Sequence, residues 1–161
     1  MQQRGLFTGH ALNAIDAKGR VAIPAGLRQI IEQNGEGRFL FIGKHDCDPC
    51  LTGYDRGWSQ HLREELRRDE AIKAATANAD DRHNLKRRAF GLVEEVPYDS
   101  SGRFILPGFF KDKAQLDDLA FFFGTGDTFE IWNPRTLIDA PGLDAEVKEI
   151  VVYLMKQRGA G

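Results

Sequence analysis

The sequence predicts an α+β fold in which a β-hairpin, helix, β-hairpin unit occurs twice, related by pseudo-twofold symmetry, with helical arms attached. The first observation is a repeat, since residues 16–24 read DAKGRVAIP and residues 99–107 read DSSGRFILP. The second copy starts 83 residues after the first, and self-similarity at a fixed offset indicates internal duplication. The second observation is that similar strand and helix patterns follow each copy. Two copies favour a paired arrangement over a solenoid.

Each copy predicts a turn, a short strand and the start of a helix. Asp16 and Asp99 can accept hydrogen bonds from the amides that follow them, and Gly19 and Gly102 can adopt positive φ without a steric cost. Apolar residues alternate after each glycine, as in a strand with one buried face. The proline that ends each copy suits the first turn of a helix. These two aspartates and two glycines are therefore predicted to shape two hairpin turns.

The elements expected around each copy follow the same order. In the first copy they are a strand within 6–15, a helix over 24–33, and strands over 38–42 and 51–54; in the second they are a strand over 94–98, a helix over 107–114, and strands over 119–123 and 128–132. The sequence GTGD at 124–127 predicts a hairpin turn between the last two strands.

Helical spacing of apolar residues predicts arms outside the two repeats. A stripe that begins at Trp58 predicts a helix ending near Ala77, residues 80–81 are expected to cap a second helix reaching Phe90, and a final helix starts near Leu143. Apolar stripes on extended arms need a partner surface, which predicts self-association. The expected domains are a first repeat over 5–55, a helical arm over 56–90, a second repeat over 91–135 and a C-terminal helix over 136–161.

Composition and charge limit the function classes. The chain has 161 residues, of which 42% are apolar and 29% charged, as is usual for globular proteins. A formal charge of −2 argues against a simple basic domain. The charge is unevenly distributed, since residues 1–90 carry +3 (15 Lys or Arg, 12 Asp or Glu) and residues 91–161 carry −5 (7 and 12). Within the first 30 residues, four cations face a single acid, which predicts a local positive patch. These residues are Arg4, Lys18, Arg20 and Arg28, against Asp16.

No enzyme is predicted, because no nucleophile can be paired with a base. The four histidines are scattered, and neither a G-x-S-x-G nor an H-E-x-x-H motif is present. No apolar stretch is long enough for a signal peptide or a membrane span. The expectation is a cytoplasmic protein without contact to a membrane.

Cys47 and Cys50 form a C-x-x-C motif with His45 two residues before it, which could be half of a zinc site. Zinc needs four ligands, and the sequence has no second cysteine pair to complete them. We therefore predict no metal and no cofactor, and interpret the pair as loop cysteines, with a redox role as the alternative.

Two interpretations remain for Arg20 and Arg103, which leave the two predicted turns. Each could form an internal salt bridge with the aspartate four residues earlier, or contact DNA through guanine O6 and N7 or through phosphates. The same arginine in both turns favours presentation on one surface. The run KRR at 86–88 is typical of a solvated helix end, with DNA contact as the alternative.

With these residues identified, the chain resembles the MraZ family of bacterial regulators, which belongs to the SpoVT/AbrB-like group of swapped-hairpin β-barrels. The resemblance is carried by the two D-x-x-x-R motifs, by GRVAIP at 19–24 and GRFILP at 102–107, and by FEIW at 129–132. It implies a swapped-hairpin β-barrel and a transcriptional regulator that binds double-stranded DNA. The implied site is the promoter of the division and cell-wall gene cluster, where short G-rich direct repeats are recognised.

The resemblance also implies a ring-like homo-oligomer associated with the nucleoid. The residues predicted to bind DNA are Arg20 and Arg103, with Lys18 and Arg4 contributing to phosphate contacts. Ser101 replaces Lys18 in the second turn, so that turn is expected to be less basic and Arg103 to contribute less than Arg20. The alternative function is an antitoxin-like protein-interaction module of the same barrel group, which a disordered toxin-wrapping tail would favour.

Overall fold

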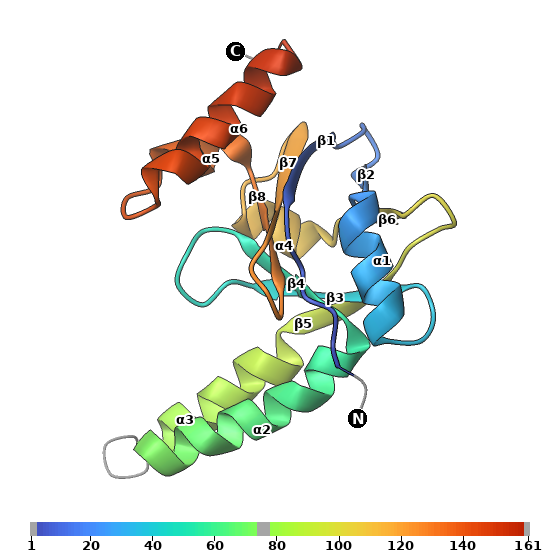
Figure 1. Ribbon diagram of the computed structural model, residues 1–161. Coiled ribbons are helices and arrows are strands. Elements are labelled where there is room, and N and C mark those ends of the chain that lie inside the picture. Colours follow the sequence, from blue (N-terminus) through green and yellow to red (C-terminus); the bar gives the residue numbers. More distant parts are fainter. Residues whose placement is uncertain (1–2, 74–77, 160–161) are drawn as a thin grey trace.

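The computed structural model describes residues 3–73 and 78–159, which form a mixed α+β fold with a six-stranded antiparallel sheet and a separate two-stranded ribbon (Figure 1). The strands are β1 (His10–Ala14), β2 (Arg20–Ala22), β3 (Phe39–Lys44), β4 (Leu51–Tyr54), β5 (Val93–Pro97), β6 (Arg103–Ile105), β7 (Leu119–Gly124) and β8 (Phe129–Trp132). The helices are α1 (Ala25–Asn34), α2 (Arg56–Lys73), α3 (Ala79–Lys86), α4 (Gly108–Lys113), α5 (Pro134–Asp139) and α6 (Ala145–Gln157), with a π-helical turn, η1 (Arg87–Gly91), after α3.

The sheet interleaves strands from the two repeats in the order β1-β7-β8-β4-β3-β5. Strand β1 of the first repeat pairs with β7 of the second, and β5 of the second repeat pairs with β3 of the first. Exchanging the repeats maps this order onto itself, with the symmetry axis between β4 and β8. The repeat in the sequence therefore corresponds to a symmetric arrangement of strands in the sheet. The predicted pairs β3–β4 and β7–β8 are confirmed.

The strands on either side of each repeated turn do not pair with each other as the sequence predicted. A backbone hydrogen bond from Asp16 N to Arg20 O (2.9 Å) closes the first turn, and β2 then pairs with β6 of the other repeat. This pairing places Val21 opposite Phe104, with both side chains buried. The contact between these two apolar side chains across the strands stabilises the pairing of β2 with β6. Over the described residues, the ribbon and the six-stranded sheet do not close into one barrel.

Two apolar clusters hold the strands together. The larger one joins the sheet, the ribbon, α1 and α4, and includes Phe7, Leu27, Leu40, Phe110 and Phe122. The smaller one lies under α5 and α6, where Phe121 and Trp132 of the sheet meet Leu137, Val151 and Met155. The C-terminal helix is therefore packed on the sheet.

Helices α2 and α3 form an arm that extends away from the sheet (Figure 1). Leu66 of α2 and Phe90 of η1 line one groove along this arm. The cap of α3 is Asn78, whose side chain accepts a hydrogen bond from Asp81 N at 2.8 Å. The prediction from the sequence that residues 80–81 cap this helix was wrong. These two aspartates lie in the first turn, where acidic side chains complement the helix dipole. The predicted end of the first arm helix near Ala77 lies outside the described residues.

A membrane span is not found among the described helices, since none combines the required length with sufficient apolar character.

Candidate nucleic-acid interface

The ribbon of β2 and β6 brings the two repeated turns together on one surface. Val21 pairs with Phe104 at the centre of the ribbon, and both side chains point into the core. Side chains alternate between the faces of a strand, so Arg20 and Arg103, each one residue before the central pair, share the opposite, solvent face. They are diagonal neighbours across the ribbon, which separates their Cα atoms by about 7–8 Å.

The first turn is held by its aspartate. Asp16 Oδ1 accepts hydrogen bonds from the amides of Lys18 and Arg20, both at 2.9 Å, and Oδ2 accepts one from Arg20 Nε at 2.8 Å. Gly19 has φ +81°, a conformation that side chains with a Cβ rarely adopt. One carboxylate therefore fixes both the backbone of the turn and the guanidinium that leaves it.

The second turn repeats this geometry. Asp99 Oδ1 accepts from the amides of Ser101 (2.9 Å) and Arg103 (3.0 Å), and Oδ2 accepts from Arg103 Nε at 3.2 Å. Gly102 also has φ +81°. The local similarity of the two sequences therefore extends to individual hydrogen bonds.

These bonds hold the aspartates in their ionised form. For Asp16, hydrogen bonds from the backbone and then the side chain of Arg20 are the main causes that lower its pKa. For Asp99, the backbone amide of Arg103 is the main cause that lowers the pKa. The carboxylates stay charged at neutral pH and keep the guanidinium groups in place.

The internal Asp–Arg salt bridge, one of the two interpretations that the sequence allowed, is present in both turns. It occupies only part of each guanidinium group. The bond uses Nε, while Nη1 and Nη2 of Arg20 and Arg103 have no hydrogen-bond partner among the described residues. The two side chains are 40% and 51% exposed. Each arginine therefore presents its Nη1–Nη2 edge to solvent, oriented from behind by the aspartate.

A cation from outside the repeated motif lies beside the second turn. Arg28 of α1 lies against Gly102: its Nη1 atom is 2.7 Å from the position that a Cβ on Gly102 would occupy. Lys18 is exposed in the first turn, whereas the equivalent Ser101 is uncharged. From the sequence, Arg28 was interpreted only as one cation of a basic N-terminal segment. Its position beside Gly102 could not be predicted, because it depends on the pairing of β2 with β6.

Arg4 lies elsewhere, near the start of α2. Its guanidinium donates two hydrogen bonds of 2.9 Å to Asp55 and stacks over Trp58, with the ring centroid 5.6 Å from Cζ. The Asp55 side chain is 0% exposed and that of Arg4 is 18% exposed. Asp55 also accepts from Asn34 Nδ2 (3.1 Å) and from Trp58 N (2.8 Å). The structure does not bring Arg4 together with the two turns, and gives it a role in tying the N-terminal segment to α2.

The basic run at 86–88 spans the end of α3 and the start of η1, in the arm that extends away from the ribbon (Figure 1). Arg87 of η1 donates a hydrogen bond to Asn84 Oδ1 of α3 at 2.9 Å. This run does not lie beside Arg20 or Arg103.

Comparisons with known proteins identify relatives along most of the chain. The family described as "MraZ protein, putative antitoxin-like" matches residues 6–83. A protein named transcriptional regulator MraZ from Ruegeria sp. (strain TM1040) is 33% identical over 148 residues, covering 87% of this chain and 84% of the relative. A protein of the same name from Roseiflexus castenholzii is 34% identical over 81% of this chain and 82% of the relative. These matches show that the chain belongs to the MraZ family.

Proposed function

We propose that this protein is a sequence-specific, DNA-binding transcriptional regulator that reads DNA with the solvent face of the β2–β6 ribbon. The observation that carries the proposal is the pair of equivalent arginines, Arg20 and Arg103, exposed side by side on that face and each oriented by an aspartate. The relatives' name, transcriptional regulator MraZ, supports the same function.

The chemistry of the exposed guanidinium edge suits guanine. Two adjacent N–H donors match the O6 and N7 acceptors of guanine in the major groove. The separation of about 7–8 Å between the two arginines is close to two base steps of about 3.4 Å each. A short G-rich element would therefore offer an acceptor pair to each arginine, with Lys18 and Arg28 on the flanking phosphates.

The proposed operator is a set of short G-rich direct repeats in the promoter of the division and cell-wall gene cluster, and the protein would act at the nucleoid. We further propose that the exchange of strands between repeats corresponds to the swapped-hairpin barrel of the SpoVT/AbrB-like group. The support is the crosswise pairing of β1 with β7, β3 with β5 and β2 with β6.

A gel-shift titration tests this function. We expect DNA from the promoter upstream of the protein's own gene to bind more tightly than a scrambled duplex of equal length. Affinity should fall as salt rises, with a log-log slope of about −0.9 per phosphate contacted. Equal affinity for both duplexes, or an affinity that does not respond to salt, would contradict the proposal.

We also propose that the protein forms a ring-like homo-oligomer, which would present several ribbons to successive repeats. Large apolar side chains remain exposed on the arm, on α6 and near the N-terminus, namely Phe90, Leu92, Tyr153 and Leu6. Exposed apolar side chains at several sites favour burial against further copies. Light scattering at micromolar concentration should give a mass several times that of one chain, and a monomer would refute the ring.

An antitoxin-like interaction module is the second candidate, because the family description itself contains the term antitoxin-like. The C-terminal segment over 145–157 is a helix packed on the sheet through Val151 and Met155. This arrangement gives less support to a disordered toxin-wrapping tail. Specific binding of the isolated protein to its promoter would favour the regulator, whereas binding that requires a second protein would favour the module.

A further inference from the structure

The loop between β3 and β4 is built around His45 and carries the C-x-x-C motif. Lys44 Nζ donates hydrogen bonds to the carbonyl oxygens of His45 (2.9 Å) and Asp48 (2.5 Å) within the loop. Backbone hydrogen bonds from His45 N to Cys50 O (3.0 Å) and from Cys50 N to Asp48 O (2.8 Å) also stabilise the loop. The positions of His45 and Cys50 are therefore fixed by the loop backbone.

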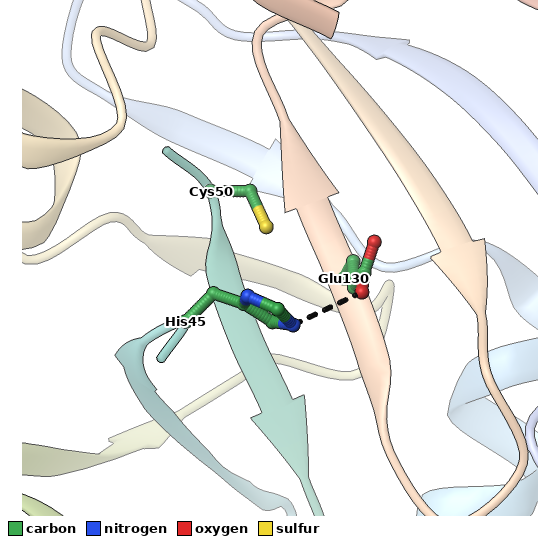
Figure 2. A group of neighbouring side chains, drawn as sticks. All are labelled: His45, Cys50 and Glu130. Atoms are coloured by element: carbon green, nitrogen blue, oxygen red, sulfur yellow. Dashed lines mark ion pairs between the residues drawn. The ribbon is translucent and has the colours of Figure 1, made fainter. Parts of the chain in front are cut away.

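A third side chain from the other repeat completes a cluster. Glu130 of β8 lies opposite Thr52 in the β4–β8 pair, and its Oε2 atom is 3.3 Å from His45 Nε2. Figure 2 shows the side chains of His45, Cys50 and Glu130 pointing toward one another. One nitrogen, one sulfur and one oxygen all lie within 4.8 Å of one another.

We propose that His45, Cys50 and Glu130 bind a divalent transition-metal ion of borderline softness, of which Zn²⁺ is the first choice. An imidazole, a thiolate and a carboxylate are the three ligand types that zinc takes in proteins. One thiolate and one carboxylate also neutralise the two charges of the ion, which suits a half-buried position. The sequence prediction of no metal was made without Glu130, which is 80 positions from Cys50 in the sequence.

The fourth coordination position would face solvent. His45 and Glu130 line a groove of about 440 Å³ between the arm and the sheet, into which Trp58 and Leu62 of α2 also project. An ion can enter through this groove, and a water molecule can complete a tetrahedral set. Three protein ligands with one open position is the arrangement of zinc sites that exchange ligands.

Groups around the cluster are suited to orient the ligands. Trp132 Nε1 donates to Glu130 Oε1 at 2.8 Å, which leaves Oε2 directed at His45. His45 Nδ1 now accepts from the amides of Cys47 (3.2 Å) and Asp48 (3.0 Å), so the ring carries its hydrogen on Nε2. If Nε2 binds the ion, the hydrogen must lie on Nδ1, so the amides of Cys47 and Asp48 must turn away from this atom and Asp48 Oδ2, now 3.8 Å from it, would become the acceptor.

The proton balance of binding is simple. Burial raises the pKa of the Cys50 thiol, so the metal-free thiol is neutral and must lose one proton to solvent when it coordinates the ion. Burial opposes ionisation of Glu130 too, but hydrogen bonds from His45 and Trp132 outweigh it and lower the pKa of Glu130. The hydrogen bond with Glu130 raises the pKa of the His45 imidazole, so a ring that is protonated must also lose its extra proton before Nε2 can coordinate, and ion binding releases protons and strengthens as pH rises.

Titration of the full chain with Co²⁺, after treatment with a chelator, tests the site. We expect one ion per chain, with the intense visible bands of tetrahedral Co²⁺ and a near-ultraviolet thiolate-to-metal charge-transfer band. Glu130→Gln keeps an acceptor for Trp132 and should weaken binding at least about tenfold. Cys50→Ser should remove the charge-transfer band. Cys47→Ser is the matched control and should retain both stoichiometry and spectrum, because Cys47 is exposed and outside the cluster.

Circular dichroism and melting curves identify variants that have lost the fold. If Cys50→Ser does not fold, Glu130→Gln and Cys47→Ser decide the question by themselves. The proposal is overturned if the wild-type chain binds no stoichiometric Co²⁺ or Zn²⁺ at micromolar concentration. It is equally overturned if Cys47→Ser abolishes binding while Glu130→Gln leaves it unchanged, since the ion would then sit on the exposed thiol.

Discussion

Replacing Arg4 with alanine should lower the free energy of unfolding by about 3–5 kcal/mol, as expected when one member of a buried ion pair is removed. Asp55 is fully buried, and two of its hydrogen bonds come from the Arg4 guanidinium. Without that cation the carboxylate retains the amide of Trp58 and the side chain of Asn34. Neither of these partners supplies a positive charge, so the remaining anion destabilises the fold. Urea unfolding followed by circular dichroism measures the difference.

Arg56→Ala is the matched control. Arg56 pairs with Glu95, but the two side chains are 44% and 37% exposed, and a solvent-exposed pair contributes at most about 1 kcal/mol. Arg4→Ala should also leave the DNA affinity of the folded protein unchanged, because Arg4 is not on the ribbon. A stability loss no larger than that of Arg56→Ala would show that the Arg4–Asp55 pair does not stabilise the fold. A specific loss of DNA affinity in Arg4→Ala would indicate that Arg4 contributes to DNA binding.

Local interactions explain what the sequence could predict. Each repeated turn depends on a carboxylate that bonds amides two and four residues ahead and on a glycine with positive φ, all within five residues. The Leu27 and Ile31 spacing that marks α1 is similarly local, and both side chains are buried. Such features can be read from a short segment because their partners lie in the same segment.

Pairing between distant segments explains what the sequence could not predict. The partner of Arg4 is 51 residues away at Asp55, so a basic N-terminal segment was interpreted as a solvent-facing patch. The hairpin expected at residues 6–24 requires β1 and β2 to pair, yet each pairs with the other repeat. Alternating apolar residues show which face of a strand is buried but do not identify its neighbour.

One element was missed for a different reason. Helix α5 has only six residues, too few to show a helical period, although Asn133 accepts a hydrogen bond from Arg135 N and Pro134 stands in the first turn. These two capping residues were the available signal. The helix matters because Leu137 belongs to the second core under α6.

Replacing Arg20 with alanine should weaken binding to the operator by about 1–3 kcal/mol per engaged site, and repeated sites in an oligomer should multiply the loss. The Nη1–Nη2 edge proposed to contact guanine is removed with the side chain. Thermal stability should change little, because the Arg20–Asp16 pair is exposed and the amide of residue 20 still bonds Asp16. Operator affinity by gel shift and the melting temperature should be measured on the same preparation.

Arg103→Ala provides the internal comparison, and Arg68→Ala, which removes one exposed cation from α2, provides the charge control. The sequence alone suggested a milder effect at Arg103 because Ser101 replaces Lys18. The structure places Arg28 against Gly102, so the second turn also has a neighbouring cation, and we expect losses of similar size from both turns. If Arg20 and Arg103 serve only to hold their aspartates, both variants should melt at lower temperature while the folded protein keeps its affinity. That result, or an equal loss from Arg68→Ala, would remove the two arginines from the proposed DNA interface.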